Sequence, residues 1–73
     1  METLIKNLKI SVNGSSVHIP NGANITDLLR NLDLNSEMVA IELNAQIVPR
    51  TEYAGRKLNE GDVLEIVHFV GGG

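Results

Sequence analysis

The stretch from residue 8 to residue 32, LKISVNGSSVHIPNGANITDLLRNL, predicts the first half of the fold. Its first residues, 8–12, alternate between apolar and polar side chains, as in a strand that buries one face. Asn13-Gly14 follows, the dipeptide that best tolerates the positive φ angles of a tight hairpin turn. Alternation returns over residues 17–19, so we predict an N-terminal β-hairpin that ends at Pro20.

The spacing of the apolar side chains then changes to that of a helix. Apolar residues recur at i, i+3, i+4 and i+7 from Ile25 to Leu32, which places them on one stripe of a helix. Asn24 is a suitable N-cap, and Asp27 can complete a capping box with it. A helix of two to three turns is unstable alone in water, so we expect it to dock on the sheet.

A third strand and a short fourth strand are predicted next. Side chains alternate again over residues 39–43, and residues 46–48 follow after a tight connection at Asn44-Ala45. Pro49 cannot donate a backbone hydrogen bond, so the fourth strand is expected to be short or to lie at a sheet edge.

The remaining residues complete the element order. Residues 50–58 are read as an irregular crossover held in the core by Tyr53 and Leu58, and residues 59–62 as a turn before a last strand over 63–70. The order β-β-α-β-β-β, with one helix packed on one face of a mixed sheet, is the plan of the β-grasp, or ubiquitin-like, fold. By themselves, period and order establish a small α+β domain.

The predicted core consists of the apolar residues on the inward side of each strand and on the helix stripe. They are Leu8, Ile10, Val12, Val17, Ile19, Ile25, Leu28, Leu29, Leu32, Val39, Ile41, Leu43, Leu64 and Ile66.

The composition describes one small folded domain. The chain has 73 residues, of which 42% are hydrophobic and 21% charged, and this excludes collagen-like and disordered classes. The net charge of −3 argues against a nucleic-acid partner, since phosphates require a basic surface. The chain has no cysteine, so disulfides, cysteine-based zinc sites and a thiol nucleophile are excluded.

No targeting or membrane segment is recognised. Residues 1–6 lack the apolar region of a signal peptide, and no apolar run approaches the ~20 residues that span a bilayer. We therefore expect a soluble cytoplasmic protein with no membrane partner, monomeric when free.

The sequence contains no recognisable catalytic set, so the chain is not expected to be an enzyme or to hold a cofactor or metal. His18 and His68 are isolated in sequence and read as partly exposed strand residues. Glu42, Asp62 and Glu65 are expected to belong to a solvated surface that could weakly attract basic partners.

The chain ends in three glycines, Gly71, Gly72 and Gly73, directly after a predicted strand. Glycine has no side chain and a wide range of φ, so we expect residues 1–70 to form a single domain and residues 71–73 a thin, flexible tail. Such a tail could enter a narrow active site of another protein, where any side chain would clash.

Several stretches resemble the sulfur carrier proteins of thiamine biosynthesis, the ThiS family. Residues 61–73, GDVLEIVHFVGGG, resemble the C-terminus of that family, and residues 48–54, VPRTEYA, resemble its segment after the fourth strand. Leu43-Asn44 and the helix start at residues 26–29 agree as well, so the resemblance covers roughly residues 7 to 73. The chain departs from the family in its first six residues and at Ala45, where glycine is common.

The resemblance implies a mechanism and three partners. An adenylyltransferase would use ATP to activate the carboxylate of Gly73, and sulfur from a cysteine desulfurase would replace AMP to give a thiocarboxylate. Thiazole synthase would then take the sulfur. Gly71 and Gly72 would supply reach and slenderness rather than chemistry.

Strand parity predicts a docking surface beside the tail. If Glu65 faces solvent, Val67 and Phe69 share its side of the last strand, away from the helix. Two apolar side chains exposed next to a functional tail are expected to form a docking patch for the adenylyltransferase and the synthase.

Other functions share this fold and tail. The alternatives are the small subunit of molybdopterin synthase, a ubiquitin-like modifier joined to lysines through its glycines, and a passive interaction module.

Overall fold

The structure is a computed structural model that describes residues 7–69. The predicted order of strands and helix is confirmed, with two added 3-10 turns. The elements are β1 Asn7–Val12, β2 Ser15–Pro20, α1 Ile25–Asn31, η1 Ser36–Met38, β3 Val39–Leu43, β4 Gln46–Val48, η2 Arg50–Glu52 and β5 Val63–His68. The predicted crossover over 50–58 thus begins with η2, and the last strand ends at His68. Val70, where that strand was expected to end, lies outside the described residues.

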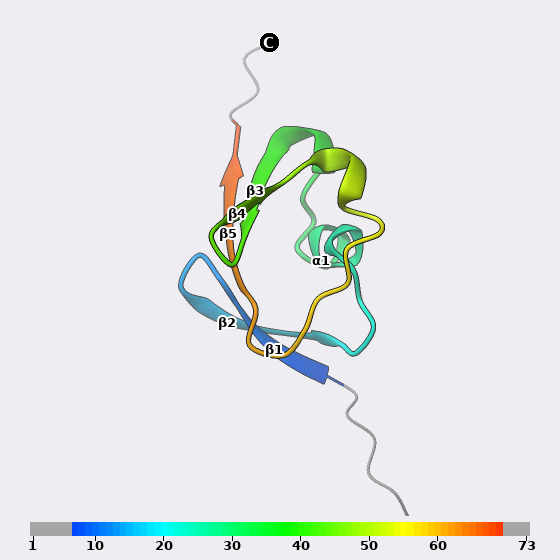
Figure 1. Cartoon of the computed structure of the whole chain (residues 1–73), viewed down its shortest axis with the longest axis vertical. Helices are drawn as coiled ribbons and strands as arrows, with labels where there is room; N and C mark the ends of the chain where they lie inside the picture. Colours follow the sequence, from blue (N-terminus) through cyan, green and yellow to red (C-terminus); the bar gives the residue numbers. More distant parts are fainter. Residues whose placement is uncertain (1–6, 70–73) are drawn as a thin grey trace, which may run out of the picture.

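The five strands form one mixed sheet in the order β2-β1-β5-β3-β4 (Figure 1). Strand β5 lies at the centre, parallel to β1 and antiparallel to β3, while both hairpins are antiparallel. Strand β4 lies at one edge, directly before Pro49, as a residue without a backbone N–H requires. This architecture confirms the α+β, β-grasp prediction.

Both hairpins turn through two residues with positive φ. Asn13 (φ 51°) and Gly14 (φ 86°) connect β1 to β2, and Asn44 (φ 51°) and Ala45 (φ 70°) connect β3 to β4. Positive φ at both central residues is the mark of a type I′ turn, whose twist matches that of the strands. Ala45 therefore adopts the left-handed geometry that glycine usually provides.

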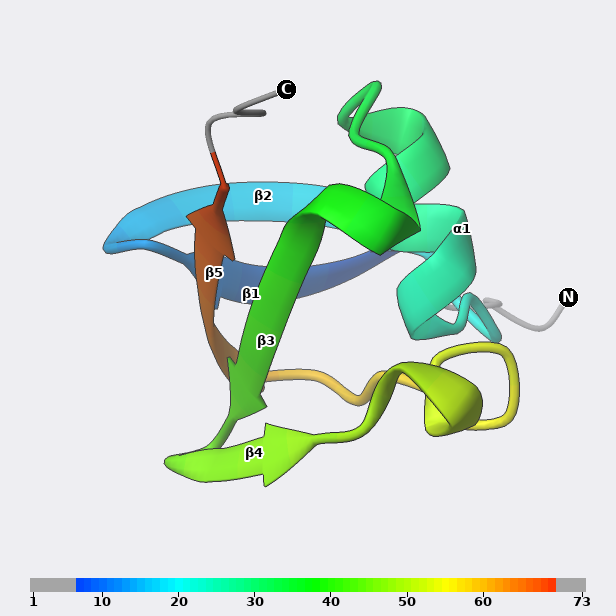
Figure 2. The same ribbon diagram turned by 90° about the horizontal axis from the view of Figure 1, so that it is seen from above.

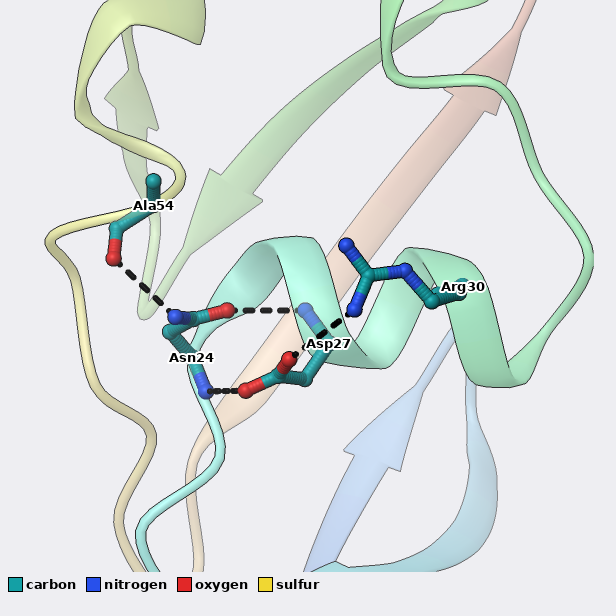
Figure 3. Close-up of polar contacts among 4 residues, drawn as sticks. All are labelled: Asn24, Asp27, Arg30 and Ala54. Carbon is teal, nitrogen blue, oxygen red and sulfur yellow. Dashed lines mark hydrogen bonds and ion pairs between the residues drawn. The ribbon is translucent and has the colours of Figure 1, made fainter.

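The capping box of α1 is formed as predicted (Figure 3). The Asp27 backbone N–H donates to Asn24 Oδ1 at 2.8 Å, and the Asn24 N–H donates to Asp27 Oδ2 at 3.0 Å. Asn24 Nδ2 also donates to the Ala54 carbonyl at 3.0 Å, which ties the start of the helix to the segment after η2.

The core lies between α1 and the sheet and contains most of the residues predicted for it. Tyr53 and Leu58 are buried, as expected for anchors of the crossover. Two predicted core residues, Val17 and Leu32, are only partly buried. Val17 lies on the edge strand β2, and Leu32 is the C-cap that follows the last helical residue.

Asp62 corrects the expectation of a solvated acidic surface. It is only 9% exposed, and its carboxylate accepts hydrogen bonds from Asn44 Nδ2 (3.0 Å) and the Asn59 N–H (2.8 Å). The carboxylate organises the turn that leads into β5, which explains its burial. Glu42 and Glu65 are exposed, as expected.

Candidate functional site

Strand β5 leads toward the terminal glycines and is anchored by side chains from both hairpin turns. Asn13 Oδ1 accepts from the Ile66 N–H at 2.7 Å, and Asn13 Nδ2 donates to the Ile66 carbonyl at 3.0 Å. From the other side of the strand, Asn44 Oδ1 accepts from the Val63 N–H at 2.9 Å. These amides extend the hydrogen bonding of β5 beyond the ladder, so the direction of the strand is fixed on both sides.

The pairing of β5 with β3 continues one residue past the strand. The Phe69 N–H donates to the carbonyl of Met38, the last residue of η1, at 2.7 Å. The predicted tail residues Gly71, Gly72 and Gly73 lie outside the described residues, so the assignment of Gly73 as the chemical site stays a prediction.

The predicted exposure of Val67 and Phe69 is confirmed, since Val67 is 57% exposed and Phe69 49% exposed. Along β5, Val67 is out of phase with the buried residues Leu64 and Ile66, so it lies on the face of the sheet opposite the core and α1; Figure 2 shows the helix to one side of the strands. Ile47 is 70% exposed and Val63 46% exposed, and these two apolar residues were missed as candidates. The signal was present in the sequence, because both lie one residue from a buried neighbour on their strand.

We define the open face as the outward residues of β3, β4 and β5. They are Ala40, Glu42, Ile47, Val63, Glu65 and Val67. All but Val63 line a shallow hollow of about 340 Å³. The open face is thus a mainly apolar surface, slightly hollowed, with two carboxylates within it.

A larger hollow of about 480 Å³ lies where β2 passes into α1, but its two charged side chains already have partners. Its charged residues, Asp27 and Arg30, pair with each other at 3.6 Å, and Asp27 also serves the helix cap. We therefore place the candidate site on the open face.

The titratable groups of the described residues do not form a metal-binding cluster. Within residues 7–69 no group of three or more His, Cys, Asp or Glu side chains is placed to hold a metal ion. His18 and His68 are both exposed, on different strands. Burial raises the pKa of Tyr53, and the charge of Arg50 partly opposes this shift.

Within residues 7–69, no helix has the length and apolar character to cross a membrane.

Comparison with known proteins gives consistent matches. The model of the ThiS family matches residues 9–73. The sulfur carrier protein ThiS of Bacillus subtilis is 45% identical over 49 residues, which cover 67% of this chain and 74% of that protein. A crystal structure of the thiamine biosynthesis protein ThiS from Geobacter metallireducens aligns with a TM-score of 0.76 at 30% identity, over 90% of this chain and 100% of that one.

A third match is to a much longer protein. The thiazole synthase of Paramagnetospirillum magneticum is 41% identical over 66 residues, or 90% of this chain. The chain spans only 20% of the length of that synthase.

Proposed function

The chain belongs to the ThiS family, and we propose that it acts as a sulfur carrier in thiamine biosynthesis through the carboxylate of Gly73. The observation that carries the proposal is the position of β5. This strand is central in the sheet, is held by amides from two turns, and leads toward Gly71–Gly73 beside exposed Val67 and Phe69. A firmly held body would then present a terminal carboxylate to other proteins.

Activation is the first chemical step of this proposal. A carboxylate is a poor electrophile because its charge is delocalised over the acyl group. An adenylyltransferase would bind the tail and ATP together, and a carboxylate oxygen of Gly73 would attack the α-phosphorus while pyrophosphate leaves. The resulting acyl-adenylate has a good leaving group, AMP.

Sulfur transfer is the second step. The terminal sulfur of a persulfide, formed by a cysteine desulfurase, would attack the acyl carbon and displace AMP. Reduction of the resulting acyl disulfide by a thiol would leave the thiocarboxylate. The carrier has no cysteine, so none of its own side chains is a thiol that could divert this sulfur.

Thiazole synthase is the proposed acceptor of the sulfur. The similarity to one fifth of the thiazole synthase from Paramagnetospirillum magneticum supports this partner, since a related sequence there forms part of the synthase chain. The carrier would be a co-substrate of the synthase and of the adenylyltransferase, with no cofactor of its own.

The proposal is tested by intact mass. The chain is incubated with the adenylyltransferase of the same organism, ATP, the desulfurase and cysteine, and we expect the mass to rise by one oxygen-to-sulfur exchange. A chain lacking Gly73 serves as control and should not change. An unchanged mass of the full chain, or a branched conjugate to lysine, would contradict the carrier function.

The docking role of Val67 and Phe69 has a separate test. Replacing both residues by Ser removes exposed apolar surface, so the KM of the chain in adenylation should rise by about tenfold, as for other central contact residues. The melting temperature should change little, because both residues are exposed and lie outside the core. The control is His18→Ser, an exposed change on the distant edge strand β2. Equal KM values for the double variant and the control would contradict the docking role.

A further inference from the structure

Two carboxylates oppose each other at the centre of the open face. Glu42 on β3 and Glu65 on β5 are cross-strand partners in the antiparallel register, and both are exposed. Side chains directly opposite in such a pair have Cβ atoms about 4.5–5.5 Å apart, and like charges at this spacing destabilise a sheet.

The described residues provide no counterion for this pair. Their ion pairs join Arg30 to Asp27 and Arg56 to Glu52, away from the open face. Lys9 lies on β1, where its carbonyl accepts from Gly61 in the turn before β5, and it forms no ion pair with Glu42 or Glu65.

Apolar side chains surround the acidic pair. Ile47 on β4 is the cross-strand partner of Glu42. Ala40 and Val67 form the next cross-strand pair on the open face, two residues along from Glu42 and Glu65. Ile47 and Val67 are the most exposed large apolar side chains described. A matching surface would therefore carry a cation between apolar groups. Arginine suits this description, because its guanidinium is weakly hydrated, planar and able to contact two carboxylates.

We propose that the adenylyltransferase docks on the open face and places an arginine between Glu42 and Glu65. This inference rests on the proposed function and names the chemistry of one partner. The adenylyltransferase is favoured over the synthase by charge complementarity, because an enzyme that binds ATP gathers cationic groups around the triphosphate. The open face adjoins the end of β5, so it would lie close to that basic region when the tail enters.

Loss of these two charges should stabilise the free chain but weaken its complex with the adenylyltransferase. In the free chain, neutralising the pair relieves repulsion and raises the melting temperature. In the complex it removes the partners of the arginine and weakens binding. A purely structural role for the two residues would not give this opposition of signs.

The experiment compares the wild type with the double variant Glu42→Gln, Glu65→Gln in adenylation by the adenylyltransferase. We expect the KM for the chain to rise by about tenfold, with kcat unchanged. The KM of the wild type should increase with salt, whereas that of the double variant should depend on salt much less. Glu37→Gln on η1, also exposed, is the matched charge control and should keep the wild-type KM and its salt dependence.

The outcomes separate the two proposals. A wild-type chain that is adenylated with a KM equal to that of the double variant at all salt concentrations would overturn the arginine contact alone. The same holds if the double variant binds thiazole synthase more weakly while its adenylation is normal. A wild-type chain that is not adenylated at all would overturn the proposed function and this inference with it.

Discussion

Single polar residues in the turns hold the central strand. Asn13 and Asn44 each provide positive φ for a hairpin and an amide side chain for β5. Asp62 then binds Asn44 and the backbone of Asn59, so its buried carboxylate has its partners. An alanine at position 13 or 44 would remove both contributions, since it has no amide and disfavours positive φ.

Ala45 gives a prediction at this scale. An L-residue in the left-handed region is strained, so Ala45→Gly should raise the free energy of unfolding by about 1 kcal/mol. Thermal melting of the purified chain measures this change. The matched control is Ala54→Gly, because Ala54 does not have a positive φ. This control relieves no strain and only increases the conformational entropy of the unfolded chain, so it should lower the stability. A melting temperature for Ala45→Gly at or below that of wild type would show that the turn is not strained.

At the scale of elements, α1 depends on the sheet for its stability. The helix has only seven residues, too few to be stable alone in water. Its capping box supplies part of the stabilisation that it needs. Its inward residues Ile25, Leu28 and Leu29 are almost fully buried. The bond from Asn24 to Ala54 joins the helix to the crossover as well. Packing therefore decides whether this short helix forms.

Leu28 tests the dependence of the helix on packing. Leu28 has 0% exposure, so Leu28→Ala should lower the free energy of unfolding by about 2–5 kcal/mol through lost burial and a cavity. Urea denaturation followed by circular dichroism provides the measurement. Leu32→Ala is the control on the same helix stripe and should cost less, because Leu32 is only partly buried. Equal losses for the two variants would contradict the assignment of the buried face.

At the scale of the whole molecule, stability and proposed chemistry lie in different parts of the chain. The core that the structure describes extends from Leu8 to Ile66. The proposed chemical residue is Gly73, and the proposed docking residues Val67 and Phe69 are exposed, near the end of β5 and just after it. Such a division allows the carrier to exchange partners without a change in its fold.

Gly72 tests this division. Gly72→Leu should leave the melting temperature within about 2 °C of wild type, because surface changes away from the core shift stability by only ~0.5 kcal/mol. The same variant should lose most adenylation and sulfur transfer, since a bulky side chain would not fit a narrow path to ATP. Gly55→Leu, in the exposed loop after η2, controls for a leucine added outside the tail and should retain transfer. Full activity of Gly72→Leu would contradict the narrow-path argument.

Much of the fold and of the candidate site could be predicted from local sequence. Alternation with period two located the strands, and the 3.6-residue period with Asn24 and Asp27 located the helix and its cap. The parity of β5 also predicted that Val67 is exposed on the same side of the strand as Glu65. These features depend on residues a few positions apart, whose spacing fixes the direction of each side chain.

Tertiary structure alone decided the features that join distant residues. The burial of Asp62, the amides of Asn13 and Asn44 on β5, and the opposition of Glu42 and Glu65 depend on strand order and register. Val17 is partly exposed although Ile19 on the same strand is buried, so its exposure depends on how far the core extends along β2, which local alternation cannot reveal. The physical reason is that a period of two fixes the side of a strand on which a residue lies but carries no information about the strand beside it.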